Sequence, residues 1–370
     1  MQFEEKATYR KSTLIIACAA LVAVILIALT ALGVFGGGDR SMSYTKLRCM
    51  ATQDVTPFGD KVLYYDGTTL YCLNDRGNEL WNQPLGAGAG FSVGDTHLVA
   101  WVGSQLFIFD EDGHPTYNDH QGGEVQFARC GSRYVAAVIG EDISPTLVVK
   151  DMDGIDVDSE EDAYDDMLIL DMGFFSGGDY LWVTALDVYG TVPNNKLYTL
   201  RVGQMNTGEV SLGEPLVYQV LYAGNELNVI TTRQLTQYDY RGTQDESGTR
   251  LVYGWQLIHA DLSSANAQLL FATSRQASGL SGHGITALRL LFGNVDNQYT
   301  LPTSCAGAVV YRSKIYAFSD DSVYRTGFNE RRFTALSLPM DAQITDYLGM
   351  MDGGRVLLSS GDDVYIMQLN

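Results

Sequence analysis

Beyond residue 50 the chain alternates short apolar runs with Gly-centred turns, and one phrase of this pattern returns about eight times. Its first copy is the turn Gly59-Asp60 followed by the apolar run 61–65. Later copies begin near Gly94, Gly131, Gly177, Gly224, Ala265, Arg312 and Gly353. The mean step is about 42 residues, and strand-length segments fill each copy. Such a repeat of strands is typical of a β-propeller, so we predict an all-β, eight-bladed β-propeller.

The first copy is the clearest and predicts strands at 55–58, 61–65, 69–73 and 79–82. Tight turns at Asp66-Gly67 and at 74–77 join them, with residues that tolerate positive φ. In the second strand both alternating sets of side chains are apolar. This indicates a sheet that is covered on both faces, as a blade is by its two neighbours.

The later copies predict further blades of the same kind. Their strands are expected at 98–102 and 105–109; 125–128, 134–139 and 146–150; 168–174, 180–186 and 196–202; 217–222, 226–231 and 234–240; 255–261, 268–273 and 285–292; 308–311, 314–318, 322–325 and 332–338; and 344–350, 355–359 and 363–369. The last copy ends after three strands, so we expect residues 43–50 to supply its fourth and close the ring. The sixth copy is the least regular, and a seven-bladed ring is the alternative.

The amino-terminal region predicts a membrane anchor. No charged residue occurs from Ser12 to Gly38, and residues 14–35 are apolar apart from Thr30 and Gly33. At ~1.5 Å per residue this segment is long enough to cross a hydrocarbon core of ~30 Å. The alternative is a cleaved signal peptide. Such peptides end in a cleavage site of small residues, and Ala31-Leu32-Gly33 is similar to such a site. We predict a tail at 1–11, a transmembrane helix at 12–36, a linker at 37–42 and a propeller at 43–370.

The orientation of this anchor follows from the position of its flanking cations. Lys6, Arg10 and Lys11 precede the segment, and an equal number of cations follows it by residue 48. Arg10 and Lys11 directly abut the predicted membrane edge, which favours a cytoplasmic tail. We therefore expect a single-pass protein of the cell membrane with a cytoplasmic N-terminus and an extracytoplasmic propeller.

The net charge argues against one class of partner, and the cysteine spacing argues against one class of metal site. The net charge of −20 argues against nucleic acid, whose phosphates are held by clustered cations. Cys18 falls in the predicted anchor, and the remaining cysteines lack the close pairs of a zinc ribbon. We therefore interpret the other four as buried thiols: Cys49, Cys72, Cys130 and Cys305.

The motif of the first blade carries a family resemblance. Gly59-Asp60-x-Val62, Asp66-Gly67-x-x-Leu70-Tyr71-x-Leu73 and Asp75-x-Gly77-x-x-Leu80-Trp81 resemble the repeat of the pyrroloquinoline-quinone-like propellers. That family includes quinoprotein dehydrogenases and non-enzymatic relatives such as an envelope-assembly lipoprotein. The whole layout is also similar to a family of uncharacterised membrane-anchored proteins of Gram-positive bacteria. These resemblances imply fold and location, and no activity.

The sequence departs from the quinoprotein enzymes in ways that bear on a cofactor. Those enzymes typically carry a vicinal disulfide and repeated blade-ending tryptophans, whereas here no two cysteines are adjacent and Trp81 alone has the blade-ending position. Trp101, Trp182 and Trp255 fall in strands, where we expect core packing. No quinone site, and no other cofactor, can be assigned.

The densest polar cluster is the acidic stretch from Asp151 to Asp166. Alternating carboxylates are the ligands calcium prefers, but the calcium loop needs Gly at its sixth position and Gly154 stands at the fourth. We interpret the stretch as a solvated loop between blades, with a calcium site as the alternative.

The remaining motifs do not predict chemistry. The run 279–284 has His283 where a hydrolase elbow needs Gly, so we expect a loop there. The run 86–90 leads into a strand and lacks the last Gly of a dinucleotide site, so we expect a connection between blades. The five histidines show no metal-ligand spacing: His97, His114, His120, His259 and His283. No catalytic, cofactor-binding or metal-binding residue is assigned.

Two hypotheses of function remain from the sequence. The first is a non-catalytic scaffold that docks an envelope protein or wall polymer on the flat face of the propeller, while the N-terminal helix holds it in the lipid bilayer. The second is an enzyme, or a sensor of small ligands or ions, that uses the central channel.

Overall fold

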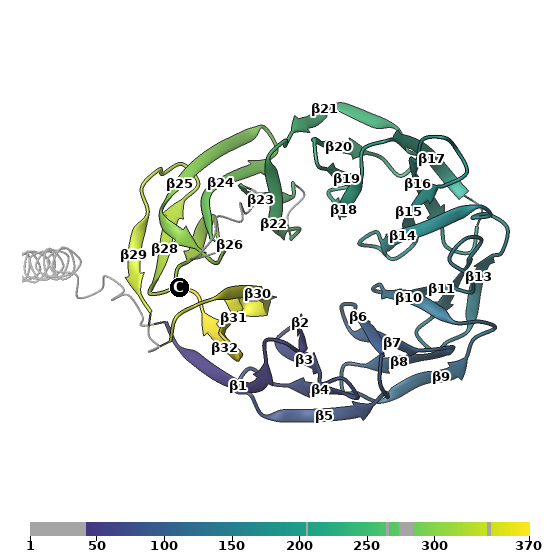
Figure 1. Cartoon of the computed structure of the whole chain (residues 1–370), viewed down its shortest axis with the longest axis horizontal. Helices are drawn as coiled ribbons and strands as arrows, with labels where there is room; N and C mark the ends of the chain where they lie inside the picture. The colour runs from purple at the N-terminus through teal and green to yellow at the C-terminus, as the bar shows by residue number, and fades with distance from the viewer. Residues whose placement is uncertain (1–41, 205, 264–265, 274–283, 339–341) are drawn as a thin grey trace, which may run out of the picture. The chain divides into compact units, whose positions relative to one another are not determined.

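The computed structural model describes residues 42–204, 206–263, 266–273, 284–338 and 342–370. The segment from Tyr44 to Leu369 forms one compact unit. Within these described ranges, eight four-stranded antiparallel sheets are arranged as a ring (Figure 1). The prediction of an all-β, eight-bladed propeller is confirmed, and the seven-bladed alternative is wrong.

Each of blades one to four is built from four consecutive strands, the first lying nearest the centre of the ring (Figure 1). These strands are β2 (Asp54–Phe58), β3 (Lys61–Tyr65), β4 (Thr69–Leu73) and β5 (Glu79–Pro84); β6 (Gly90–Val93), β7 (His97–Val102), β8 (Gln105–Asp110) and β9 (Pro115–His120); β10 (Val125–Cys130), β11 (Tyr134–Ile139), β12 (Thr146–Asp151) and β13 (Asp156–Glu160); β14 (Met167–Phe174), β15 (Tyr180–Asp187), β16 (Asn194–Arg201) and β17 (Asn206–Gly213).

Blades five to seven repeat this order, and blade eight adds a short 3₁₀ turn, η1 (Asp352–Gly354). Their strands are β18 (Val217–Ala223), β19 (Glu226–Thr231), β20 (Gln234–Tyr238) and β21 (Gln244–Leu251); β22 (Trp255–Asp261), β23 (Gln268–Thr273), β24 (Ile285–Phe292) and β25 (Val295–Cys305); β26 (Gly307–Tyr311), β27 (Lys314–Phe318), β28 (Ser322–Gly327) and β29 (Thr334–Ser337); β30 (Asp346–Met351), β31 (Arg355–Ser360) and β32 (Asp363–Gln368).

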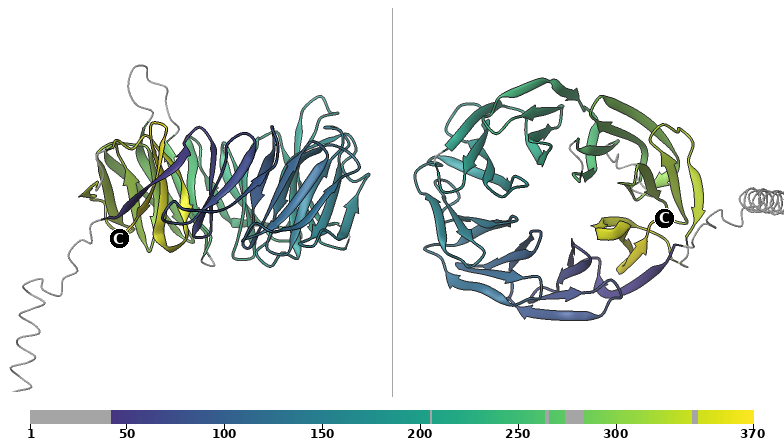
Figure 2. Two further views of the ribbon diagram at one scale, coloured as in Figure 1. Left: turned by 90° about the horizontal axis from the view of Figure 1, so that it is seen from below. Right: turned by 180° about the vertical axis from the view of Figure 1, so that it is seen from behind.

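Blade eight is completed by the first strand of the ring, β1 (Tyr44–Met50), which pairs antiparallel with β32. Tyr44 lies opposite Met367, so the two ends of the ring-forming segment meet within one sheet. Figure 2 shows this closure from two further sides. The prediction that residues 43–50 close the ring is confirmed, and the pairing removes the open edge that β32 would otherwise present.

The apolar core lies between neighbouring blades. On β3, Leu63 and Tyr65 pack into the cluster shared with blade two, whereas Val62 and Tyr64 pack into the cluster shared with blade eight. Alternate residues of a strand point to opposite faces, so both faces of the sheet are covered. This arrangement explains why the second strands are mostly apolar on both of their faces.

A repeated turn joins the third and fourth strands of blades one, two, three and five. An Asn or Asp opens it, its Oδ1 accepts backbone N–H groups two and four residues on, and a Gly with positive φ follows three residues after it. The four turns begin at Asn74, Asp110, Asp151 and Asp239. Their shared side-chain geometry is the Asx turn, which satisfies backbone donors locally.

The Gly of this turn receives a side chain from the outer strand of the preceding blade. The indole of Trp81 lies against Gly113, where an added Cβ would come within 2.5 Å of the ring, and Trp81 Nε1 donates to the Glu111 carbonyl at 3.1 Å. Tyr117 lies against Gly154 in the same manner. We call this contact the rim latch; the blade-ending aromatic of the sequence motif supplies it.

Several predictions about individual elements need correction or remain open. Blade six, expected to be irregular, is complete, and its strands β22, β23 and β24 have the predicted bounds. The predicted tail, transmembrane helix and most of the linker lie outside the described residues. In the part of the chain that is described, no helix is long and apolar enough to cross a membrane.

Candidate functional site

The propeller presents two flat faces with different content. Successive strands of a blade are antiparallel, so the turns between second and third strands and the connections between blades share one face. We call it the connector face. The opposite face carries the turns between first and second and between third and fourth strands.

Large apolar side chains are exposed on a sector of the connector face that belongs to blades three to five. Tyr253 is 81% exposed, Tyr189 74% and Leu251 72%. We call the whole set the apolar arc; its members are Ile143, Val188, Tyr189, Val192, Leu216, Leu251 and Tyr253. Exposed apolar residues scattered singly are ordinary, but a group confined to one face is typical of an interaction surface.

Buried neighbours hold the segments that carry the apolar arc. Val252, between Leu251 and Tyr253, is fully buried, and its N–H donates to the Arg233 carbonyl at 2.8 Å. Asn195 is also buried, and its Nδ2 donates to the carbonyl of Pro215 at 3.1 Å, which fixes the segment bearing Leu216. The exposed side chains are therefore presented by anchored backbone.

The acidic connection between blades three and four is anchored in the same way. Tyr164 is buried, and its ring meets that of Tyr198 edge-on at a centroid distance of 5.5 Å. The N–H of Asp166 donates to Ser144 Oγ at 3.1 Å, which ties this connection to the turn bearing Ile143. The backbone that carries the carboxylates around Tyr164 is thus held beside the turn that bears Ile143.

Charge is distributed unequally between the two faces. Among the described residues, the turns and connections of the connector face hold twelve exposed carboxylates and one cation, Arg233. The carboxylates are Asp66, Glu124, Glu141, Asp142, Glu161, Asp162, Asp165, Asp166, Glu214, Asp320, Asp321 and Asp362. The described turns of the opposite face hold six arginines beside ten carboxylates. Seven of these twelve carboxylates lie in the segments 140–145, 161–166 and 214–216, beside the apolar arc.

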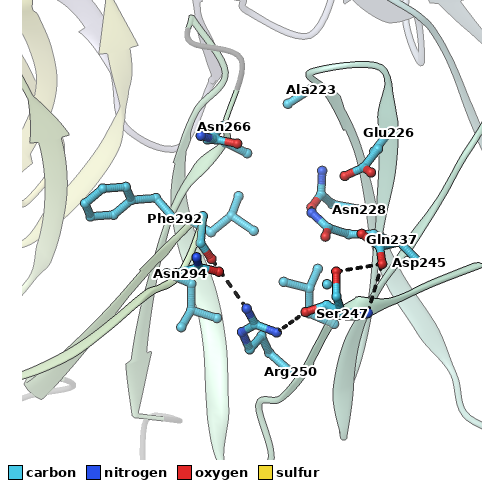
Figure 3. Close-up of a pocket in the computed structure, with 16 residues that line it drawn as sticks. Ala223, Glu226, Asn228, Gln237, Asp245, Ser247, Arg250, Asn266, Phe292 and Asn294 are labelled. Atoms are coloured by element: carbon cyan, nitrogen blue, oxygen red, sulfur yellow. Dashed lines mark hydrogen bonds between the residues drawn. The ribbon is translucent and has the colours of Figure 1, made fainter.

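A polar pocket of about 280 Å³ lies between blades five and six (Figure 3). Blade five contributes Glu226, Asn228, Gln237 and Arg250, and blade six contributes the turn Gly293-Asn294 from across the gap. Leu235, Leu269 and Leu291 form apolar parts of its wall. The pocket opens toward the face opposite the connector face, because it lies at the ends of strands that turn there.

A bulge in β21 shapes this pocket. Leu235 pairs with Arg250 and Gln237 pairs with Asp245, so β21 has three more residues than β20 between these two pairs. Asp245 Oδ1 accepts the Ser247 hydroxyl at 2.7 Å, and Arg250 Nη1 donates to the Ser247 carbonyl at 2.6 Å (Figure 3). Such bulges displace an outer strand from its partner and are frequent beside functional sites.

The charged groups of the pocket are of both signs. Burial, together with the nearby charge of Asp245, raises the pKa of Glu226. The hydrogen bonds from the Ser247 side chain and backbone lower the pKa of Asp245. Buried Asn228 accepts a hydrogen bond from Gln237 Nε2 at 2.9 Å. The pocket therefore combines two carboxylates, several amides and one guanidinium, a lining suited to a small polar molecule.

The acidic stretch at 151–166 is not one site. Asp151 opens one of the four repeated turns, and its Oδ1 already accepts the N–H groups of Asp153 and Ile155. Residues Asp156–Glu160 form the outer strand β13, so the expectation of a continuous solvated loop was wrong. The carboxylates that follow β13 lie at the connector face, and those that precede it lie at the opposite face. The spacing of Asn or Asp three residues before Gly, shared with Asn74 and Asp110, is the sequence signal for this turn.

The structure places the other singled-out residues as follows. The run 86–90 connects β5 to β6, as predicted. The run 279–284 lies outside the described residues except for Gly284. His114 and His120 are exposed, His97 is half-buried, and His259 is half-buried beside Tyr347. Over the described ranges, no group of three or more His, Cys, Asp or Glu side chains is placed to hold a metal ion.

The four propeller cysteines are free, and Cys49, Cys72 and Cys305 are buried as predicted. Cys130 is partly buried. Burial raises the pKa of the Cys49 thiol to about 11 and that of Cys72 to about 12. These thiols are packing residues with little thiolate at neutral pH.

A second hollow, of about 480 Å³, lies beside the inner strands of blades eight, one and two. Gln53, Asp54 and Thr56 line it together with the aromatic rings of Phe91 and Trp101. Asp54 is the one charged residue in its lining. The carboxylates of the connector face thus do not converge on this hollow.

Comparison with solved structures gives the fold. BamB from Moraxella catarrhalis, a propeller of pyrroloquinoline-quinone-like repeats, matches with a TM-score of 0.51 and 12% identity over 89% of this chain and 97% of that chain. Sqt1 from Saccharomyces cerevisiae matches at 0.58 and 9% identity, over 89% and 99%. The Pan2 WD40 domain from Neurospora crassa matches at 0.54 and 9% identity, over 90% and 97%.

The chain matches no family model and no curated protein in sequence. The structural likenesses establish the β-propeller fold. The resemblance to the membrane-anchored family of Gram-positive bacteria stays a prediction.

Proposed function

We propose that this chain is a membrane-anchored, extracytoplasmic propeller that acts as a non-catalytic scaffold and docks an envelope protein on its connector face. The observation that carries this proposal is the apolar arc, in which seven large side chains are exposed on one sector of one face. When a partner covers exposed apolar groups of this kind, the loss of their contact with water favours binding. Their anchored backbone lowers the ordering cost of association.

The anchor in this proposal rests on the uncharged segment 12–36 and on the cations that precede it. Connectivity is compatible with it, because β1 begins with Tyr44 at the face opposite the connector face.

Site-specific photocrosslinking of the full-length chain in intact membranes tests the docking role. A photoreactive phenylalanine analogue replaces Tyr189 or Tyr253, and the control places it at Leu80, an exposed residue of β5 outside the arc. We expect discrete protein adducts from the two arc positions and none from Leu80. Equal adduct patterns at all three positions, or no adduct at the arc, would contradict the proposal.

The pocket between blades five and six supports a second candidate function, the sensing of a small polar ligand. Its two carboxylates and the Arg250 guanidinium would match a molecule that carries both an amine and an acidic group. This candidate moves the ligand site of our second hypothesis from the central channel to a cleft between blades.

A thermal-shift screen of the full-length chain with single amino acids, hexoses and divalent cations tests this second candidate. A ligand present at 100 times its Kd stabilises the folded state by about 2.7 kcal/mol. The shift should vanish in Glu226→Gln and Arg250→Gln and persist in Glu246→Gln, whose exposed side chain does not line the pocket. A shift that all three variants retain would place the ligand elsewhere.

A further inference from the structure

We infer that the partner of the connector face is a basic amphipathic protein segment, in which lysines or arginines alternate with apolar side chains. This inference rests on the proposed docking function and adds the chemistry of the partner. Two independent features of the same sector carry it, the apolar arc and the carboxylates that alternate with it around the ring.

The first feature is the order in which acidic and apolar residues occur along the sector. The turn after β11 contains Glu141 and Asp142 beside Ile143. The next connection contains four carboxylates in the segment 161–166, and the next turn carries Tyr189. Glu214 then precedes Leu216. A partner that covers these apolar groups must therefore also face at least seven carboxylates.

The second feature is the small number of cations available to neutralise those carboxylates. Arg233 is the one cation in the described turns and connections of this face. In the described segments 140–145, 161–166 and 214–216, no carboxylate forms an ion pair with a Lys, Arg or His side chain. Like charges repel an acidic partner, whereas cations from a basic partner would complement them.

The same charges exclude two other classes of occupant. A polyanionic wall polymer and an anionic lipid surface would both bring negative charge against this sector, with repulsion over about one Debye length of ~8 Å at physiological salt. A purely cationic partner would leave Tyr253 and Leu251 in water. The complementary partner needs both properties, and aromatic residues such as Tyr189 and Tyr253 are the type that dominates binding energy at interfaces.

The test uses the full-length chain in detergent micelles and three fluorescent synthetic peptides of equal length. The first alternates Lys with Leu, the second Glu with Leu, and the third Lys with Ser. Fluorescence anisotropy is read at low and at high salt. Adsorption to the micelle is the same for every protein variant, so differences between variants report the connector face.

We expect the Lys–Leu peptide to bind most tightly, with an affinity that falls at high salt. Leu251→Ser with Tyr253→Ser should weaken it at least tenfold, and so should Glu161→Gln with Asp162→Asn and Asp165→Asn. Two matched controls should change it less than twofold: Leu262→Ser, and Asp60→Asn with Asp112→Asn, all exposed on the opposite face.

The outcomes separate this inference from the function on which it rests. If the Glu–Leu or Lys–Ser peptide binds as tightly as the Lys–Leu peptide, or if the arc variants have no effect, the assigned chemistry is wrong. Photocrosslinking at Tyr253 can still recover a partner in that case, and the docking function then stands with a different partner. If crosslinking recovers nothing and the peptides do not discriminate, both fail.

Discussion

At the scale of single residues, the most unusual titratable group is His259 in β22. The residue is half-buried, its ring meets the ring of Tyr347 edge-on, and its Nδ1 lies 3.5 Å from the Tyr347 hydroxyl. Among the described residues, buried Nε2 has no hydrogen-bond partner, and the charge of Asp261 acts on the ring. Burial lowers the pKa of His259 to about 4 despite that carboxylate. The histidine is thus a packing residue held in its neutral form.

This burial predicts a loss of stability in mild acid. An unfolded histidine has a pKa of ~6.5 and binds a proton as the pH falls, while folded His259 does not. The free energy of unfolding should therefore fall between pH 6.5 and about 4, by roughly 2 kcal/mol at pH 5. His259→Gln should flatten that slope in urea unfolding of the full chain. Exposed His120→Gln should keep it, and an unchanged slope in His259→Gln would refute the assignment.

The rim latch predicts unequal costs for two glycines that both have positive φ. Gly67 has a φ of 102° and open space around it, whereas Gly113 has a φ of 79° and the Trp81 ring against it. Gly67→Ala should cost about 1 kcal/mol from backbone strain alone. Gly113→Ala should cost about 3 kcal/mol, because the new methyl group also displaces the indole. Urea unfolding midpoints measure both, and equal costs would show that the latch contributes no stability.

At the scale of elements, the second strands of the blades could be predicted and most of the outer strands could not. The second strands β3, β11 and β27 are buried on both faces, so their continuous apolar runs identify them. The outer strands β13 and β17 read DVDSE and NTGEVSLG, with one and two large apolar residues respectively. They are held by backbone pairing to a third strand, and a sequence pattern does not reveal that.

The pocket between blades five and six and the apolar arc could not be predicted from the sequence, for related reasons. The pocket depends on the bulge of β21, whose residues 244–251 carry one apolar side chain, Leu251. The apolar arc is made of one to three residues from each of four segments that are separate in sequence. These residues form one group only in the folded ring, where the alternating strand directions place all of these segments on the same face. The family-like motif includes Trp81, and the structure adds that this residue contacts the next blade.

Strand β1 gives a prediction at this scale. Deleting residues 43–50 should leave β32 as an unpaired edge, lower the melting temperature and produce oligomers in size-exclusion chromatography. Moving the same residues behind Asn370 through a short hairpin linker should restore a monomer, because β1 and β32 are antiparallel and Tyr44 lies opposite Met367. If the deletion alone stays monomeric and equally stable, closure by β1 is unimportant.

At the scale of the whole molecule, the proposed anchor predicts a defined orientation. Glu5→Cys and Asp39→Cys flank the uncharged segment 12–36. A membrane-impermeant maleimide added to intact cells should label Asp39→Cys and spare Glu5→Cys until the membrane is opened. Native Cys49 and Cys72 should stay silent, because both are buried and burial raises the pKa of each thiol. Labelling of Glu5→Cys in intact cells would reverse the orientation, and its loss from the mature chain would indicate cleavage.

The pairing of β1 with β32 also sets the order in which the protein can be completed during synthesis. The strand that is made first acquires its partner only when β32 is made, more than 300 residues later. Until then blades one to seven can assemble on one another, while the earliest segment waits as a free extended peptide that proteases and chaperones can reach. Synthesis of β32 is therefore the step that allows the growing row of sheets to close into a ring.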